Sequence, residues 1–170
     1  MKTTNKLIVV LLIIISASQF NSCKKGDTGA PGKDGTNGNA NVTSMILNAT
    51  SWTFDGTNKW STATWSSIGI LTSDAVNSGA VMVYEGSAGD WVSCPYTLGV
   101  ADPSNPTLST LFEYQVNTIT IFKQWSDGTN PNPSTSLQYK LVCIPQHAMI
   151  AHPNLNLKNY AEVKAAFDLK

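Results

Sequence analysis

The apolar residues of this chain follow two patterns, one continuous and one broken into short runs. Residues 7–15 read LIVVLLIII, nine apolar positions without interruption. From residue 42 onward, apolar residues come in short runs separated by Gly, Asp, Asn and Pro, the residues that favour turns. The first pattern indicates a targeting segment and the second a folded domain over residues 42–170.

The short runs have the length and spacing of β-strands. Alternation is clearest in two of them, where Ile119 and Ile121 alternate with threonines, and Tyr139, Leu141 and Cys143 share one face. Glycine-rich or asparagine-containing connections at 86–90 and 115–117 predict two hairpins. We expect a mainly β fold, a β-sandwich of no specified topology, with strands in residues 42–49, 80–85, 91–96, 107–114, 118–124 and 137–144.

The last segment changes its period. Tyr160, Val163 and Phe167 stand three and four residues apart, which is the spacing of one helical face. Asn159, with Glu162 three residues later, resembles a capping box. A short C-terminal helix should therefore lay its apolar face on the sheet.

Composition changes this picture by excluding some partners. Lysine and arginine total 11, as do aspartate and glutamate, and only 13% of residues are charged. The chain therefore has no basic field for nucleic acid and no acidic field for a cationic partner. With 170 residues it has room for one ordinary domain plus appendages.

The first 22 residues have the three parts of a secretory signal. Lys2 and Lys6 form the positive start, residues 7–15 the apolar core, and a short polar stretch leads to Cys23. A helix that spans a bilayer needs about 20 apolar residues, so the apolar core is too short to be one. We predict a lipoprotein signal peptide over residues 1–22.

Residues 20–23 (FNSC) resemble a lipobox, in which the cysteine is acylated and becomes the mature N-terminus, although only Ser22 and Cys23 fit its usual pattern. We predict acylation of Cys23, including palmitate, because this cysteine stands where the signal should end. Two or three acyl chains would anchor the protein stably, since each buried methylene contributes about 0.8 kcal/mol. The alternative is a cut after Ser18, which gives a soluble secreted protein with an unpaired Cys23.

Glycine recurs at every third position after the cysteine. The triplets GDT, GAP, GKD, GTN and GNA run from Gly26 to Ala40. This is the collagen repeat, in which only glycine fits at the crowded axis of the triple helix. Because the block is short and holds only Pro31, we expect a flexible tether over residues 23–41, with a weak trimer as the alternative. The tether would span about 20 Å as a coil or about 45 Å fully extended.

Taken together, Cys23, the triplets over 26–39, the segment 39–42 (NANV) and the closing segment 159–167 resemble a group of small Bacteroidota lipoproteins described as collagen-like. The resemblance covers most of the chain and implies a cell-envelope lipoprotein, most simply of the outer membrane, with no established activity. Surface-exposed lipoproteins of that phylum often carry acids just after the cysteine, where this chain has Lys24 and Lys25. The periplasmic face and the cell surface are therefore both left open.

Cys94 and Cys143 are the two other cysteines of the chain. In an oxidising compartment they can form a disulfide. The alternative is a pair of buried free thiols that act as small apolar side chains. The Cα separation decides between these two states, and the sequence does not supply it.

Candidate metal and catalytic groups are weak. His147 and His152 have a spacing seen in some zinc pairs, but no Cys-x-x-Cys accompanies them, so we expect solvated side chains in a proline-containing loop. The tetrapeptide Asp-Gly-Thr-Asn occurs at 34–37, 55–58 and 127–130. Its oxygens suit calcium, yet Asp-Gly is also a strong turn former, and we favour turns. We predict no metal, no cofactor and no catalytic residue.

The five tryptophans are the most suggestive binding feature. Tryptophans fill cores, and we expect most of them there. Exposed ones can stack against sugars or peptides, and Trp60 and Trp125 are the candidates because each lies beside an Asp-Gly-Thr-Asn turn. Our first hypothesis is a non-enzymatic, membrane-anchored envelope module of unknown ligand. The alternatives are a glycan- or protein-binding lipoprotein that uses exposed tryptophans and, less favoured, a secreted hydrolase.

Overall fold

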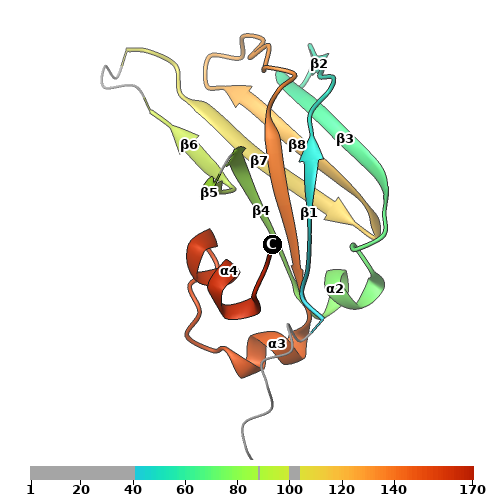
Figure 1. The fold of residues 1–170 in the computed structure, drawn as a ribbon. Coiled ribbons are helices and arrows are strands. Elements are labelled where there is room, and N and C mark those ends of the chain that lie inside the picture. The colour runs from blue at the N-terminus through green and yellow to red at the C-terminus, as the bar shows by residue number, and fades with distance from the viewer. Residues whose placement is uncertain (1–40, 88, 100–103) are drawn as a thin grey trace, which may run out of the picture. The chain divides into compact units, whose positions relative to one another are not determined.

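Two antiparallel sheets form the folded domain (Figure 1). A computed structural model of the chain describes residues 41–87, 89–99 and 104–170. The four-stranded sheet has the order β1 (Thr43–Asn48), β9 (Gln138–Ile144), β4 (Ala80–Ser87), β5 (Asp90–Ser93). The five-stranded sheet has the order β2 (Thr53–Asp55), β3 (Trp60–Ile68), β8 (Asn117–Trp125), β7 (Leu108–Gln115), β6 (Tyr96–Leu98).

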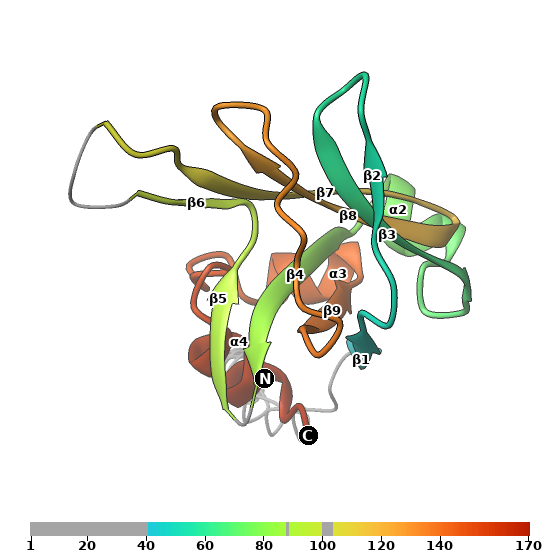
Figure 2. The same cartoon turned by 90° about the horizontal axis from the view of Figure 1, so that it is seen from above.

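The sheets pack face to face, which confirms the predicted β-sandwich (Figure 2). Ile119 and Ile121 of β8 are fully buried against Leu141 and Val83 of the four-stranded sheet. The threonines that alternate with these isoleucines face away from the interior, as their period of two requires.

A second core lies on the other face of the four-stranded sheet. Helices α3 (Gln146–Ala151) and α4 (Tyr160–Phe167) cover this face, where Val142 and Ile144 meet the apolar side of α4. Because β9 has a core on each side, every residue from Tyr139 to Ile144 is buried. The alternation predicted for this segment is confirmed.

Helix α4 begins and packs as predicted. Tyr160, Val163 and Phe167 are buried in the second core. The Asn159 side chain accepts hydrogen bonds from the backbone N–H groups of Ala161 and Glu162, and its amide donates to Glu162 at 2.7 Å. These bonds satisfy donors that the first turn of a helix leaves unpaired.

The predicted strand over 91–96 was wrong, because it is two strands in different sheets. Its first part is β5, and Tyr96 opens β6 in the five-stranded sheet. Pro95 stands between them, and proline cannot donate to a ladder. The first hairpin connection is also shorter than predicted, since Ser87 pairs with Asp90.

Strand β3 and helix α2 (Ser73–Asn77) were not predicted. In β3, Ser61 and Ala63 point into the interior, while Thr62 and Thr64 point outward. Small and polar residues thus occupy both faces, and the strand shows little alternation between apolar and polar positions. Among the described residues, no helix is long and apolar enough to cross a bilayer.

Candidate functional site

Trp60 and Trp125 lie on opposite faces of the five-stranded sheet. Ser61 pairs with Lys123, and both side chains are buried between the sheets. Trp60 is adjacent to Ser61 and faces outward, where its ring meets Phe122 edge-on at 5.1 Å between centroids. Trp125 follows Lys123 by two positions and takes the inner face. Both are half-buried, and they do not form one stacking platform.

The other tryptophans pack on the two cores, although each is half-buried. Trp52 and Trp65 contact Tyr139 edge-on, with ring centroids 6.4 and 6.1 Å apart. Their indole N–H groups donate to the backbone carbonyls of Ser134 and Asn48. The rings of Trp52 and Trp65 therefore pack on the core between the sheets, whereas Trp91 packs on the second core.

Cys94 and Cys143 are separate free thiols. Cys143 is in β9, where it pairs with Val81, and the Cys94 backbone N–H donates to Val83 on the other side of β4. With β4 between them, the cysteines are about two strand spacings of 4.8 Å apart, beyond the Cα separation of about 7 Å that a disulfide tolerates. Of the two predicted states, the structure has the buried thiols, and burial raises the pKa of each to about 12.

A buried ion pair crosses the interior at one end of the sandwich. Lys123 Nζ lies 2.8 Å from Glu85 Oε2, and it also donates to Thr110 Oγ1 at 2.8 Å. The Lys123 ammonium lies 5.8 Å from the centre of the Tyr96 ring. The period of the strand could have placed Lys123 on the inner face from sequence, because Lys123 is in phase with Ile119 and Ile121, but the sequence does not identify its partner.

The Tyr139 hydroxyl belongs to this polar cluster. It is buried and makes no hydrogen bond to the described part of the chain. Burial, and secondarily the negative charge of Glu85, raise the pKa of Tyr139, so the phenol stays protonated. The same two influences raise the pKa of Tyr96 to about 12, with burial the larger. The cluster therefore combines two protonated tyrosine hydroxyls with the ion pair between Lys123 and Glu85.

The prediction that both histidines lie in a loop was wrong for His147, which is in helix α3, whereas His152 does lie in the proline-containing segment after that helix. His147 is exposed on α3, and His152 follows that helix, half-buried, with its ring 5.0 Å from Phe167. Within residues 41–87, 89–99 and 104–170, no group of three His, Cys, Asp or Glu side chains could hold a metal ion.

Two of the Asp-Gly-Thr-Asn segments are turns, as expected. Asp55 Oδ1 accepts from the backbone N–H groups of Thr57 and Asn58, and Asp127 Oδ1 accepts from Thr129. The hydrogen bond that the Asn58 side chain donates to the Asp55 carboxylate is the main reason that the pKa of Asp55 is lowered. Each of the two carboxylates therefore accepts hydrogen bonds from residues of its own turn. The third copy, residues 34–37, lies outside the described residues, as do Cys23 and the signal segment.

One cavity has the size of a small-molecule site. It measures about 380 Å³ and lies between the β4–β5 hairpin and the start of α4. Small-molecule sites usually measure about 300–1,000 Å³. We call it the Trp91 pocket, and its lining includes Asp90, Trp91, Asn156, Lys158, Asn159 and Tyr160.

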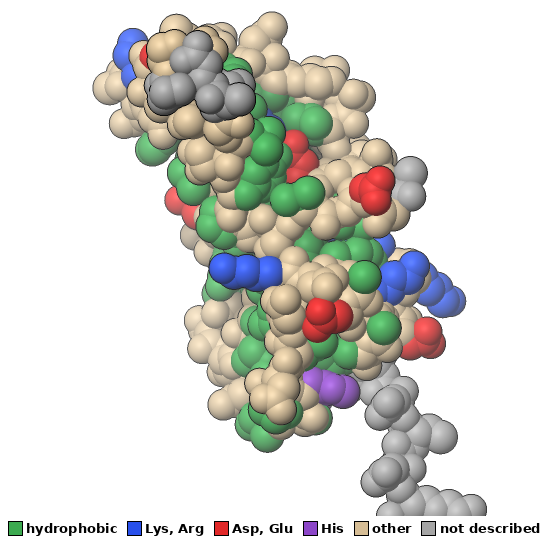
Figure 3. Space-filling view, turned by 90° about the vertical axis from the view of Figure 1, so that its left-hand side faces the viewer, with side chains coloured by type: hydrophobic (Ala, Val, Ile, Leu, Met, Phe, Trp, Pro, Cys, Tyr) green, Lys and Arg blue, Asp and Glu red, His purple; other side chains and the backbone are tan. Residues whose placement is uncertain are grey.

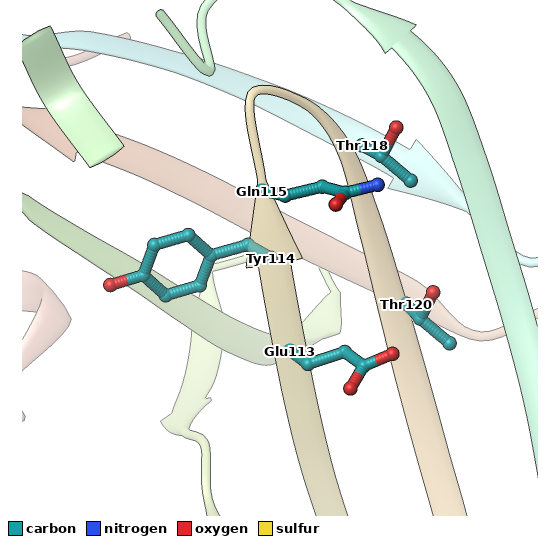
Figure 4. A pocket seen from close by; sticks show the side chains of 5 residues that line it. All are labelled: Glu113, Tyr114, Gln115, Thr118 and Thr120. Atoms are coloured by element: carbon teal, nitrogen blue, oxygen red, sulfur yellow. The ribbon is translucent and has the colours of Figure 1, made fainter. Parts of the chain in front are cut away.

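Two further cavities lined by described residues are smaller. Figure 4 shows one of about 220 Å³ on the open face of the β7–β8 hairpin, where Glu113, Gln115, Thr118 and Thr120 project from the two strands. Tyr114 points away from these four side chains. An apolar cavity of about 210 Å³ lies beside His152 and Phe167. Neither reaches the size of a typical ligand site.

The local backbone explains how the Trp91 pocket forms. Gly86 pairs with Trp91 and has a φ of 156°. A Cβ atom on Gly86 would overlap the carbonyl oxygen of Asp90, so the close approach of the two strands requires glycine here. Trp91 thereby comes to lie against Tyr160, with ring centroids 6.0 Å apart. The sequence predictions did not single out Trp91 or this pairing.

Lys140 supports the same two rings from within the second core. Its side chain is 7% exposed, and its Nζ lies 5.5 Å from the centre of the Trp91 ring and 5.0 Å from that of Tyr160. The ammonium donates to the Tyr160 hydroxyl at 2.8 Å and to the Lys170 carbonyl at 2.9 Å. These contacts hold the Trp91 ring in one orientation. No family model, curated protein or solved structure matches the chain in comparisons with known proteins.

Proposed function

We propose that this protein is a non-enzymatic lipoprotein of the cell envelope, anchored in the outer membrane through acylated Cys23. The order of segments in the sequence is the observation that carries the proposal. A basic start, nine apolar residues, a cysteine and five glycine triplets precede the first strand, which begins at Thr43. The proposal extends to the family that the sequence resembles, the collagen-like lipoproteins of Bacteroidota.

Each of these segments would have a separate physical role. Acyl chains on Cys23 would supply the anchoring free energy, about 0.8 kcal/mol for each buried methylene. A glycine-rich tether over 23–41 would place the β-sandwich about 20–45 Å from the headgroups. The sandwich would then act as a structural or binding module. A weak trimer through the glycine block belongs to the same proposal as a secondary feature.

The experiment is the intact mass of protein extracted from native membranes. We expect the mass of residues 23–170 plus acyl chains. The Cys23→Ser variant should lose the acyl mass and leave the membrane fraction. A lipid-free chain that begins at Gln19 would contradict the proposal and indicate a soluble secreted protein. Chain association would then be measured by light scattering, because the glycine block would need another role.

A further inference from the structure

The Trp91 pocket combines an aromatic wall with unused polar groups. Trp91 is half-buried, and its indole N–H donates no hydrogen bond to the described residues. The Asp90 carboxylate and the Lys158 ammonium, both on exposed residues, form no ion pair or side-chain hydrogen bond with the described part of the chain. Asn156 Oδ1 accepts from the Lys158 backbone, which leaves the amide N–H₂ of Asn156 without a described partner.

The charges around the pocket favour a neutral ligand. Asp90 and Lys158 contribute one charge of each sign to its lining. The face shown in Figure 3 likewise carries both lysine and acidic side chains, and hydrophobic side chains lie between them. Because no field of one sign is present there, neither an anion nor a cation is selected by charge. A ligand that offers hydroxyl groups can use the carboxylate as acceptor and the ammonium and amide as donors.

The Trp91 ring is also held in place before any ligand arrives. The Lys140 ammonium and the Tyr160 ring lie against it, and Tyr160 is fixed in turn by Lys140 and by its edge contact with Tyr84 at 5.1 Å. A ring that is already ordered loses little conformational entropy on binding. A flat apolar surface with polar groups at its rim matches a sugar ring, which has a face of C–H groups and an edge of hydroxyls.

We propose that the Trp91 pocket binds a neutral pyranose saccharide. One sugar ring stacks on Trp91, and its hydroxyls hydrogen-bond to the Asp90 carboxylate, the Lys158 ammonium and the Asn156 amide. The inference deepens the proposed function and rests on it only for the cell-envelope setting in which the saccharide is met.

The test is a titration of the full chain in detergent with cellohexaose, chitohexaose, laminarihexaose and mannohexaose as probes. The tryptophan indoles are labelled with ¹⁵N, and the Trp91 resonance is assigned with Trp91→Phe. We expect at least one probe to shift the Trp91 indole resonance saturably while the Trp60 resonance stays in place. No saturable shift of Trp91 with any probe would overturn the proposal, as would a shift confined to other tryptophans.

Variants separate binding from folding. Asp90→Asn and Lys158→Gln change exposed side chains and should weaken binding about tenfold, with an unchanged thermal midpoint. Trp60→Ala, a half-buried tryptophan on another face, is the matched control and should bind as the parent does. Equal loss in all three variants, or none in Asp90→Asn and Lys158→Gln, would contradict the site.

The saccharide test and the anchor test can fail independently. Cys23→Ser should bind the probe with unchanged affinity, because the pocket is far along the chain from the anchor. If the native protein carries no acyl chain and still binds the probe, the proposed anchor is refuted and the saccharide site is left intact. Acylation without binding would do the reverse. Shifts confined to β5 backbone amides on addition of an extended peptide would indicate strand addition instead and overturn the saccharide assignment.

Discussion

Lys123 and Glu85 join the two sheets through an ion pair of 2.8 Å, with side chains only 4% and 12% exposed. Lys123 comes from β8 in the five-stranded sheet, and Glu85 from β4 in the four-stranded sheet. Removing water from two charges costs several kcal/mol for each ion, and the pair offsets this only while both partners are present. The presence of the pair is therefore weak evidence for a gain in stability, whereas removal of one partner should be strongly destabilising.

We predict that Glu85→Leu and Lys123→Met will each lower the free energy of unfolding by about 3–5 kcal/mol, because each leaves a buried charge unpaired. The double variant should regain most of this loss. Urea unfolding of the four proteins in a double-mutant cycle measures the coupling. Glu113→Leu, on the exposed face of β7, is the control. Additive losses in the double variant would refute the coupling.

The buried thiols should make stability fall at alkaline pH. Burial raises the pKa of Cys94 and of Cys143 from 9.0 to about 12. Below pH 9 both thiols are protonated in the folded and unfolded states. Between about 9 and 12 only the unfolded chain releases these protons, so the free energy of unfolding falls by up to about 1.4 kcal/mol per pH unit and thiol.

Urea midpoints measured from pH 7 to pH 11 check this slope. The Cys94→Ala/Cys143→Ala variant should start from a lower stability and show a shallower decline, since it lacks both ionisations. In the parent, iodoacetamide should label these two thiols only after unfolding. Rapid labelling of the folded protein at neutral pH would show that they are neither buried nor protonated as described.

Tyr160→Phe should destabilise the protein by about 1.5–3 kcal/mol. The substitution keeps the ring but removes the hydroxyl that accepts from the buried Lys140 ammonium. Thermal unfolding measures the loss, and Tyr114→Phe is the control, because Tyr114 is 38% exposed and stacks on Phe112. An equal, small effect of both substitutions would show that the hydroxyl of Tyr160 contributes nothing.

Asp55 and Asp127 should act as turn formers and not as calcium ligands. The hydrogen bonds from Asn58 and Thr129 lower the pKa of Asp55 and Asp127, so any stabilisation they give is present at neutral pH and is lost as pH falls below the ordinary range for aspartate. Amide resonances of 55–58 and 127–130 should stay unchanged on calcium addition. Saturable shifts at micromolar calcium would reverse this assignment.

Periodicity in the sequence was enough for the elements whose two faces differ in polarity. Residues 118–124 and the helix at 160–167 were predicted from their spacing, since their apolar residues recur at the period of a strand or a helix. The same reasoning missed β3, whose inward residues include Ser61 and Ala63. A small or polar residue can be buried when its neighbours supply the apolar contact, and its own sequence carries no sign of that.

The sequence by itself determined the order of the segments and the β character of the domain. In the regular strands it also determined on which face of the strand each residue lies. The tertiary structure alone decided which faces meet. It placed Trp60 and Trp125 on opposite sides of a sheet, put β4 between Cys94 and Cys143, and brought Trp91 to Tyr160. The reason is physical: side-chain direction follows from the local backbone period, whereas the partner across a sheet or core depends on strand order and on packing between segments distant in the chain.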